Sequence, residues 1–378
     1  MRDAVSPPAA ERSADSAEPP ADSAERSADP TELPADSPAQ DIDALEAIMR
    51  LGGEGLRGRM ARAELYLERV TAGAGTPLAL HANATIAAGG KRLRPLLVLL
   101  AAQAASDPDA GGPLSTAEGD ECLLRAAVAV ELVHSATLVH DDVVDDAQLR
   151  RGRPTVAASA GRQVAIATGD LLFSRAFAEL ARNGDPAQLS ALSQASSALA
   201  AGELLQREDA YAAQVAIERY LRRCELKTAA LFEAACRLGA LVALPGSTTT
   251  LEDALGVFAR KIGLAFQILD DVLDVSGPVE RTGKSRGTDL LDGTVTLPLI
   301  LARERDGDLL GVDLAALEGP RQAEQLCDRI IATGALVQAK EQALALVADA
   351  KAALAASLPS SRAALLDLVA DAVVARYR

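Results

Sequence analysis

The chain has 378 residues, a net charge of −15 and 49% hydrophobic residues, but only 2% of its residues are aromatic. This length suffices for one large hydrophobic core or two modest ones. The negative charge argues against nucleic acid or an anionic membrane surface as a partner, because both repel an acidic protein. Alanine and leucine, which are strong helix formers, dominate the apolar residues, so the composition predicts an all-α fold.

The first 40 residues differ from the rest. They contain nine acidic residues, three arginines and seven prolines, but no aromatic residue. Such a segment buries too little apolar surface to offset the entropy of ordering. We therefore predict a disordered leader over residues 1–40 and one helical domain over residues 41–378.

Helical spacing of apolar residues continues through the rest of the chain, with short breaks rich in Gly and Pro. No segment alternates with the period of a strand, and no repeat of 20–50 residues occurs. The predicted helices cover residues 41–51, 56–72, 78–88, 96–105, 121–145, 161–183, 186–206, 217–244, 250–275, 296–305 and 323–377. Residues 107–119 and 277–293 are predicted loops.

The sequence also bears on the compartment. The N-terminal segment lacks the apolar core of a signal peptide, and no run of about 18 uncharged apolar residues follows it. The four cysteines, at positions 122, 224, 236 and 327, lie in apolar helical contexts without zinc spacing, which predicts reduced thiols. We expect a cytoplasmic protein with no stable membrane insertion.

Two aspartate clusters stand at the ends of long apolar helices. The first contains Asp141, Asp142 and Asp145, and the second contains Asp270, Asp271 and Asp274. Residues i and i+4 share one face of a helix, so each cluster stacks two carboxylates that repel one another. A divalent cation would relieve this repulsion, and Mg²⁺ typically takes one or two carboxylates together with phosphate oxygens. The alternative is a pair of acidic helix ends that face solvent.

Basic loops accompany these clusters. Residues 89–95 read Gly-Gly-Lys-Arg-Leu-Arg-Pro, and residues 150–153 read Arg-Arg-Gly-Arg directly after the first cluster. Arginine binds phosphate in a bidentate manner, and glycine lets the backbone approach an anion closely. The alternative is that these cations merely cap helix C-termini. Together with Mg²⁺ at the carboxylates, the loops predict a pocket for diphosphate esters.

In this order the motifs resemble those of the trans-polyprenyl diphosphate synthase family, from about residue 45 to the C-terminus. The resemblance rests on Gly89–Pro95, His134–Asp145, Arg150–Gly152, Gly169-Asp170, Gly202–Gln206, Lys227-Thr228, Phe266–Asp274, Gly283-Lys284, Gly287–Leu290 and Thr296–Pro298. It implies a single helical bundle of the isoprenoid synthase type around an elongated cavity. It also implies a prenyltransferase that condenses isopentenyl diphosphate with an allylic diphosphate, and a homodimer.

The resemblance also implies residue roles. Asp141, Asp145 and Asp270 would hold Mg²⁺, three ions per site with Mn²⁺ as a substitute, and Asp142 and Asp274 would assist. The expected ligands of the allylic diphosphate are Arg150, Lys227 and Lys284, and those of isopentenyl diphosphate are Lys91, Arg94, His134 and Arg151. Lys227, Thr228 and Gln267 are the expected catalytic residues; the hydroxyl and the amide carbonyl would face the allylic carbon as positive charge develops. Without the resemblance, His134 would read as a core histidine.

Product length depends on how far the growing chain can run from Asp141 towards the N-terminus of its helix. Ala136, Thr137 and Val133 line the first two turns of that path and are small. Family members that stop at 15 or 20 carbons commonly carry bulky aromatic residues near the first of these positions. We therefore expect a product of roughly 30 to 50 carbons, of the type attached to quinones; a plug from a neighbouring helix, through Leu172, Phe173 or Phe177, is the alternative.

Two other functions share part of this pattern. A class I terpene cyclase also uses an Asp-rich cluster on a helical bundle, but it needs aromatic walls, and this chain has five Phe and four Tyr. A non-catalytic subunit of a heteromeric synthase would lose the aspartates, which both clusters here retain. Prenyl elongation is therefore the predicted activity, with a short-chain farnesyl or geranylgeranyl diphosphate synthase as the alternative within the family.

Overall fold

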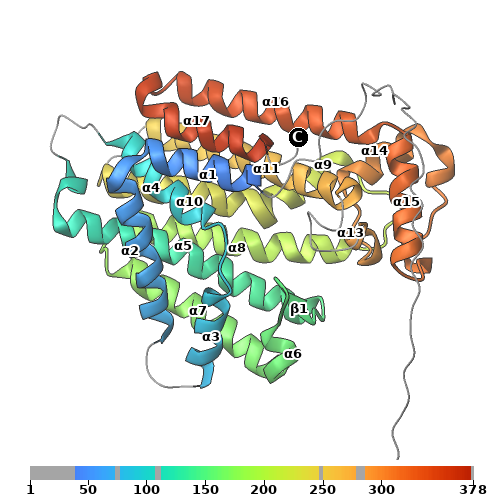
Figure 1. Ribbon diagram of the computed structural model, residues 1–378, viewed down its shortest axis with the longest axis horizontal. Helices are drawn as coiled ribbons and strands as arrows, with labels where there is room; N and C mark the ends of the chain where they lie inside the picture. The colour runs from blue at the N-terminus through green and yellow to red at the C-terminus, as the bar shows by residue number, and fades with distance from the viewer. Residues whose placement is uncertain (1–38, 73–76, 107–111, 247–249, 278–285, 376–378) are drawn as a thin grey trace, which may run out of the picture. The chain divides into compact units, whose positions relative to one another are not determined.

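A computed structural model describes residues 39–72, 77–106, 112–246, 250–277 and 286–375. The predicted leader therefore lies outside the described residues, apart from its last two positions. Lys284 lies outside them as well. The described residues belong to one compact helical unit, which Figure 1 shows with the chain coloured from blue to red.

Helices dominate the described part of the chain. Its first half contains α1 (Ala39–Leu51), α2 (Gly53–Ala72), α3 (Pro77–Ala87), α4 (Leu93–Ala105), the 3₁₀ turn η1 (Pro113–Ser115), α5 (Ala117–Val144), β1 (Leu149–Arg150), β2 (Arg153–Pro154), α6 (Val156–Ala160), α7 (Arg162–Ala181) and α8 (Pro186–Asp209). The second half contains α9 (Ile217–Cys224), η2 (Glu225–Ala229), α10 (Ala230–Ala243), α11 (Thr250–Ser276), α13 (Thr288–Leu291), α14 (Leu297–Arg305), η3 (Gly307–Leu309), η4 (Leu314–Ala316), α15 (Pro320–Ala332), α16 (Ala335–Ala355) and α17 (Ser360–Ala375).

Several boundaries differ from the sequence-based prediction. Helix α5 begins at Ala117 inside a predicted loop, because the Thr116 side chain accepts a hydrogen bond from the backbone N–H of Gly119 and caps the helix. The basic loop after the first aspartate cluster is a small antiparallel hairpin, β1–β2. The described part of the predicted loop at 277–293 contains the short helix α13. Turns divide the C-terminal helical region into α15, α16 and α17, with Gly334 in the left-handed region between the first two.

Helix α5 is the centre of the bundle. It packs against α4, α7 and α10, and α10 in turn packs against α4, α8 and α11 (Figure 1). Helix α5 is long and apolar enough to cross a bilayer by composition, but 72% of that apolar stretch is buried inside the protein, as expected of a core helix. The second aspartate helix, α11, packs between α10 and α16. The four cysteines are free thiols, as predicted.

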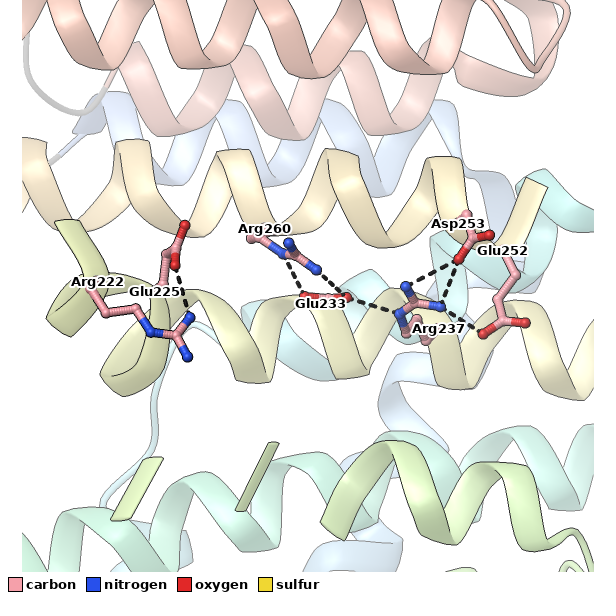
Figure 2. Close-up of polar contacts among 7 residues, drawn as sticks. All are labelled: Arg222, Glu225, Glu233, Arg237, Glu252, Asp253 and Arg260. Atoms are coloured by element: carbon pink, nitrogen blue, oxygen red, sulfur yellow. Dashed lines mark hydrogen bonds and ion pairs between the residues drawn. The ribbon is translucent and has the colours of Figure 1, made fainter. Parts of the chain in front are cut away.

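A network of ion pairs fixes α10 against α11 (Figure 2). Glu233 of α10 accepts two hydrogen bonds from the Arg260 guanidinium of α11, at 2.7 and 2.8 Å, and a third from Arg237 at 2.9 Å. Arg237 also donates to Glu252 and Asp253 at the start of α11. Burial alone would raise the pKa of Glu233, but the hydrogen bonds from Arg260 and Arg237 outweigh it and lower the pKa below 4.5.

We expect Glu233→Gln to lower the free energy of unfolding by about 1–2 kcal/mol at pH 7, because two arginines lose their charged acceptor while remaining partly hydrated. Since the pKa is lower in the folded state, this contribution is present above pH 4.5 and disappears as the pH falls through the folded-state pKa. Urea unfolding from pH 7 to pH 3 measures the effect. Glu341→Gln, at an exposed site on α16, is the control and should change little. A difference that grows on acidification would contradict the prediction.

Candidate active site

The segment that carries Lys227 and Thr228 is a single π-helical stretch, η2, between α9 and α10. Short π-helical stretches form a bulge within a helix and occur frequently at functional sites. Two glycines let neighbouring helices approach this bulge closely. A Cβ atom on Gly202 of α8 would lie 2.5 Å from the Lys227 backbone N, and one on Gly263 of α11 would lie 2.7 Å from the Ala229 Cα. Side chains at these glycines would push α8 and α11 away from η2.

A cavity of about 400 Å³ opens beside this bulge. It brings together six of the predicted site residues, from α5, η2 and α11: Asp145, Lys227, Thr228, Gln267, Asp270 and Asp274. Three further carboxylates line it, from Asp271, Asp289 and Asp292, together with Arg207 and Arg223. The structure thus places residues of both aspartate clusters, 125 positions apart for Asp145 and Asp270, around one space.

Oxygen donors crowd this cavity. Asp141 is not among the residues that line the cavity, but Lys227, Glu203 and Asp145 lie near its carboxyl group. Burial raises the pKa of Asp141 to about 6; the carboxylates of Glu203 and Asp145 raise it further, and Lys227 and Arg150 oppose the rise. Burial also raises the pKa of Asp274 to about 6, although the backbone N–H of Asp289 donates to that carboxylate at 3.2 Å. Burial is the largest cause of both shifts, so a bound cation would offset the cost of burying these carboxylates. The donor set is all oxygen, which fits Mg²⁺.

Ligation nevertheless needs more than the protein supplies. Within the described residues, no three His, Cys, Asp or Glu side chains converge closely enough to hold an ion by themselves. This fits Mg²⁺, which usually takes one or two carboxylates and completes its shell with water and substrate phosphate oxygens.

A chain of alternating charges crosses the cavity from α5 to η2. Asp145 pairs with Arg207 of α8, Arg207 donates to Glu203 at 3.2 Å, and Glu203 pairs with Lys227. Sequence reasoning assigned no role to Arg207 and none beyond motif membership to Glu203. Their spacing of four residues beside Gly202 places them on one helix face and is the signal that was available.

Asp142, the second aspartate of the first cluster, does not line the 400 Å³ cavity. Asp142 is buried and accepts a 2.7 Å hydrogen bond from Arg150 Nε. Both residues line a second cavity, of about 140 Å³, together with His134 and Arg151. Burial, and then the surrounding arginines, lower the pKa of His134 well below 6.5, so its imidazole is neutral at pH 7. The predicted helper Asp142 and the predicted allylic ligand Arg150 therefore lie together in the second cavity.

The three cations of the first basic loop have different surroundings. Lys91 is exposed, and the Arg94 guanidinium lies over the Phe232 ring, 5.0 Å from its centroid. Burial lowers the pKa of Arg94 to about 10. Arg92, in contrast, is buried and pairs with Glu64 of α2 and Glu131 of α5, at 2.7 and 2.9 Å. Arg92 thus anchors the loop to two helices, a role that the run of cations in the sequence did not reveal.

The residues predicted to set product length lie on α5, one to two turns before Asp141. Ala136 and Val133 are fully buried, and the Thr137 hydroxyl donates to the His134 carbonyl at 2.8 Å. Helix α7, which packs along α5, carries the fully buried Leu172.

Comparison with known proteins identifies the family and agrees with the fold. Residues 77–331 match the family model "Polyprenyl synthetase". The chain is 42% identical over 243 residues to heptaprenyl diphosphate synthase component 2 of Geobacillus stearothermophilus, a match that covers 64% of this chain and 72% of the relative. It is 36% identical over 296 residues to geranylgeranyl diphosphate synthase of Methanosarcina mazei, a match that covers 76% of this chain and 86% of the relative. A crystal structure of polyprenyl synthase from Caulobacter crescentus CB15, complexed with calcium and isoprenyl diphosphate, superposes with a TM-score of 0.78 at 33% identity, covering 88% of this chain and 98% of that one.

The chain belongs to the polyprenyl synthetase family, and it is a prenyltransferase of the polyprenyl diphosphate synthase type. The predicted all-α isoprenoid synthase fold and the predicted enzyme class are thereby confirmed.

Proposed function

We propose that this enzyme condenses isopentenyl diphosphate with an allylic diphosphate and repeats the step to a product of about 30 to 50 carbons. The observation that carries this proposal is the cavity in which Asp145, Asp270 and Asp274 lie together with Lys227, Thr228 and Gln267. Carboxylates that face a cation-binding space, next to a lysine and two oriented dipoles, suit ionisation of a diphosphate ester.

Different side chains bind the two diphosphates and stabilise the allylic cation. Lys227, Arg150 and Lys284 bind the allylic diphosphate, while Lys91, Arg94, His134 and Arg151 hold isopentenyl diphosphate so that its double bond lies at attack distance. Thr228 Oγ1 and Gln267 Oε1, which are 2.6 Å apart, present oxygen dipoles to the developing allylic cation. Asp141, Asp145 and Asp270, assisted by Asp274, would hold Mg²⁺ (three ions per site, replaceable by Mn²⁺), and the bound metal would neutralise the charge of the leaving diphosphate. Asp142, predicted to assist, pairs with Arg150 in the second cavity instead. The allylic C–O bond breaks, and the isopentenyl double bond attacks the resulting cation to form the new C–C bond. The released diphosphate then accepts the proton that the condensed cation loses.

Small, buried residues on α5 support the proposed product length. Ala136 and Val133 precede Asp141 on the side where the tail must grow, and neither blocks it with an aromatic ring. The relatives include a heptaprenyl and a geranylgeranyl diphosphate synthase, so a 15- or 20-carbon product is the alternative.

We place this reaction in the cytoplasm, on the strength of the free thiols, and in a homodimer. The relative named "component 2" makes a heteromer the competing assembly.

Product analysis tests this function. Purified protein is incubated with Mg²⁺ and labelled isopentenyl diphosphate, alone and with farnesyl diphosphate, and the dephosphorylated products are sized by chromatography. We expect products of 30 to 50 carbons that require the primer. A cyclic hydrocarbon from the primer alone would indicate a cyclase, and activity that appears only with a second protein would indicate a heteromer.

Lys91→Ala and Arg150→Ala test the division of the two diphosphates. Each change removes one charge-assisted phosphate contact, worth about 2 kcal/mol or more. We expect Lys91→Ala to raise mainly the KM for isopentenyl diphosphate and Arg150→Ala that for the allylic substrate, each at least tenfold. Steady-state kinetics with one substrate varied at a time measures both.

Arg162→Ala, at an exposed position at the start of α7 and outside both cavities, is the control and should change neither KM by more than about twofold. If Arg150→Ala instead raised the KM for isopentenyl diphosphate, Arg150 would belong with His134 and Arg151, whose cavity it shares.

A further inference from the structure

Four side chains form a continuous hydrogen-bonded series from the core to the first cavity. Tyr220 OH donates to Asp271 Oδ2 at 2.7 Å, and Gln267 Nε2 donates to Asp271 Oδ1 at 2.8 Å. At the other end, Thr228 Oγ1 donates to Gln267 Oε1 at 2.6 Å. Tyr220 is fully buried, and Asp271 is 4% exposed. The series joins α9, α11 and η2.

The donors and acceptors in this series are complementary. Burial raises the pKa of Asp271 to about 8, and the hydrogen bonds from Tyr220 and Gln267 oppose this shift because they favour the carboxylate form. In that form both oxygens only accept hydrogen bonds, and each has one donor. Tyr220 supplies one through its hydroxyl, and Gln267 supplies the other through its amide NH₂. A half-turn of the Gln267 amide would set its carbonyl oxygen against the Asp271 carboxylate and leave buried groups unpaired, which is costly.

We infer that Asp271, held in place by Tyr220, is the positioning residue that fixes the Gln267 amide with its carbonyl oxygen on the Thr228 side. The inference rests on the proposed function, in which that oxygen faces the allylic cation. It gives the adjacent aspartates of the second cluster separate tasks. Successive residues on a helix point about 100° apart, so Asp270 and Asp271 face different directions, and Asp271 lies at the inner edge of the cavity, where it meets the buried Tyr220.

Exchange of the donor and acceptor partners tests this inference. In Gln267→Glu, a carboxyl group replaces the amide NH₂ that donates to Asp271 at 2.8 Å, so two carboxyl groups face each other. Adding Asp271→Asn supplies an amide NH₂ that donates to the new carboxylate at position 267, so the double variant regains a complementary pair with the oxygen on the Thr228 side preserved. Gln267→Glu with Asp270→Asn is the matched control, because it removes an adjacent charge without supplying the missing donor.

Two readouts decide the outcome. In thermal unfolding, we expect Gln267→Glu to lower the midpoint by about 5 °C and Asp271→Asn to restore at least half of that loss, while Asp270→Asn does not. In single-turnover assays with farnesyl and isopentenyl diphosphates, Gln267→Glu should slow the chemical step about a hundredfold, and the exchanged pair should regain about tenfold, with little change in either KM.

Additive effects of the two substitutions on both readouts would overturn the inference, since a packing role for Asp271 predicts no compensation. Failure of the wild-type enzyme to transfer a prenyl group would refute the proposed function instead. Thermal unfolding of the single and double variants would still test the orientation of the Gln267 amide.

Discussion

Asp141→Asn is expected to lower kcat on the order of a thousandfold while leaving the fold intact. The substitution keeps the shape of the side chain but removes the charge that would hold Mg²⁺ against the leaving diphosphate. Because burial raises the Asp141 pKa to about 6, its ionisation at pH 7 destabilises the folded protein relative to the unfolded chain. The neutral amide should therefore leave the thermal midpoint unchanged or raise it, which separates lost chemistry from lost structure.

Asp146→Asn is the matched control for this substitution. Asp146 ends the same acidic run, is exposed and adopts a left-handed backbone conformation with φ of 50°, which asparagine tolerates. Its kcat should stay within about twofold of the wild type. Equal losses in both variants would mean that general negative charge, and not a specific ligand, matters at this end of α5.

Ala136→Phe should shorten the product sharply. Ala136 is fully buried and lies five residues before Asp141, about 7.5 Å along the helix. An aromatic ring there would overfill the path of the growing tail, at a cost of about 1–3 kcal/mol in stability. Chromatography of the dephosphorylated products should show that chains of 15 to 20 carbons replace the longer ones, with the rate of the first condensation largely retained.

Ala129→Phe places the same ring about 18 Å from Asp141 on the same helix. Its product should be longer than that of Ala136→Phe and shorter than that of the wild type. If the wild type already stops at 15 or 20 carbons and Ala136→Phe changes nothing, the tail does not follow α5 and another element limits its length.

Local signals in the sequence predicted much of the fold and part of the site. The apolar spacing gave the helices that carry both aspartate clusters, and i, i+4 spacing predicted that Asp141 and Asp145, and Asp270 and Asp274, share faces. The cavity then joins Asp145 with Asp270, Lys227 and Gln267. Helix ends set by a single cap, such as Thr116, were missed because Gly119 interrupts the helical pattern.

Pairings between distant residues could not be predicted. Nothing near Asp271 in the sequence indicates that Tyr220, 51 residues earlier, hydrogen-bonds to it in the core. Likewise, Arg92 looks like its neighbours Lys91 and Arg94 until the packing of α2 and α5 brings Glu64 and Glu131 to it. The π-helical stretch η2, and the close approach of α8 and α11 to it at Gly202 and Gly263, had no signal in the local apolar pattern either.

Metal dependence of chain elongation tests the central claim most directly. Purified protein with farnesyl diphosphate and labelled isopentenyl diphosphate should form a longer allylic product in Mg²⁺, lose this activity in excess EDTA and recover it when Mg²⁺ is restored. Undiminished elongation in excess EDTA would contradict the assignment of the two aspartate clusters to a shared metal–diphosphate site.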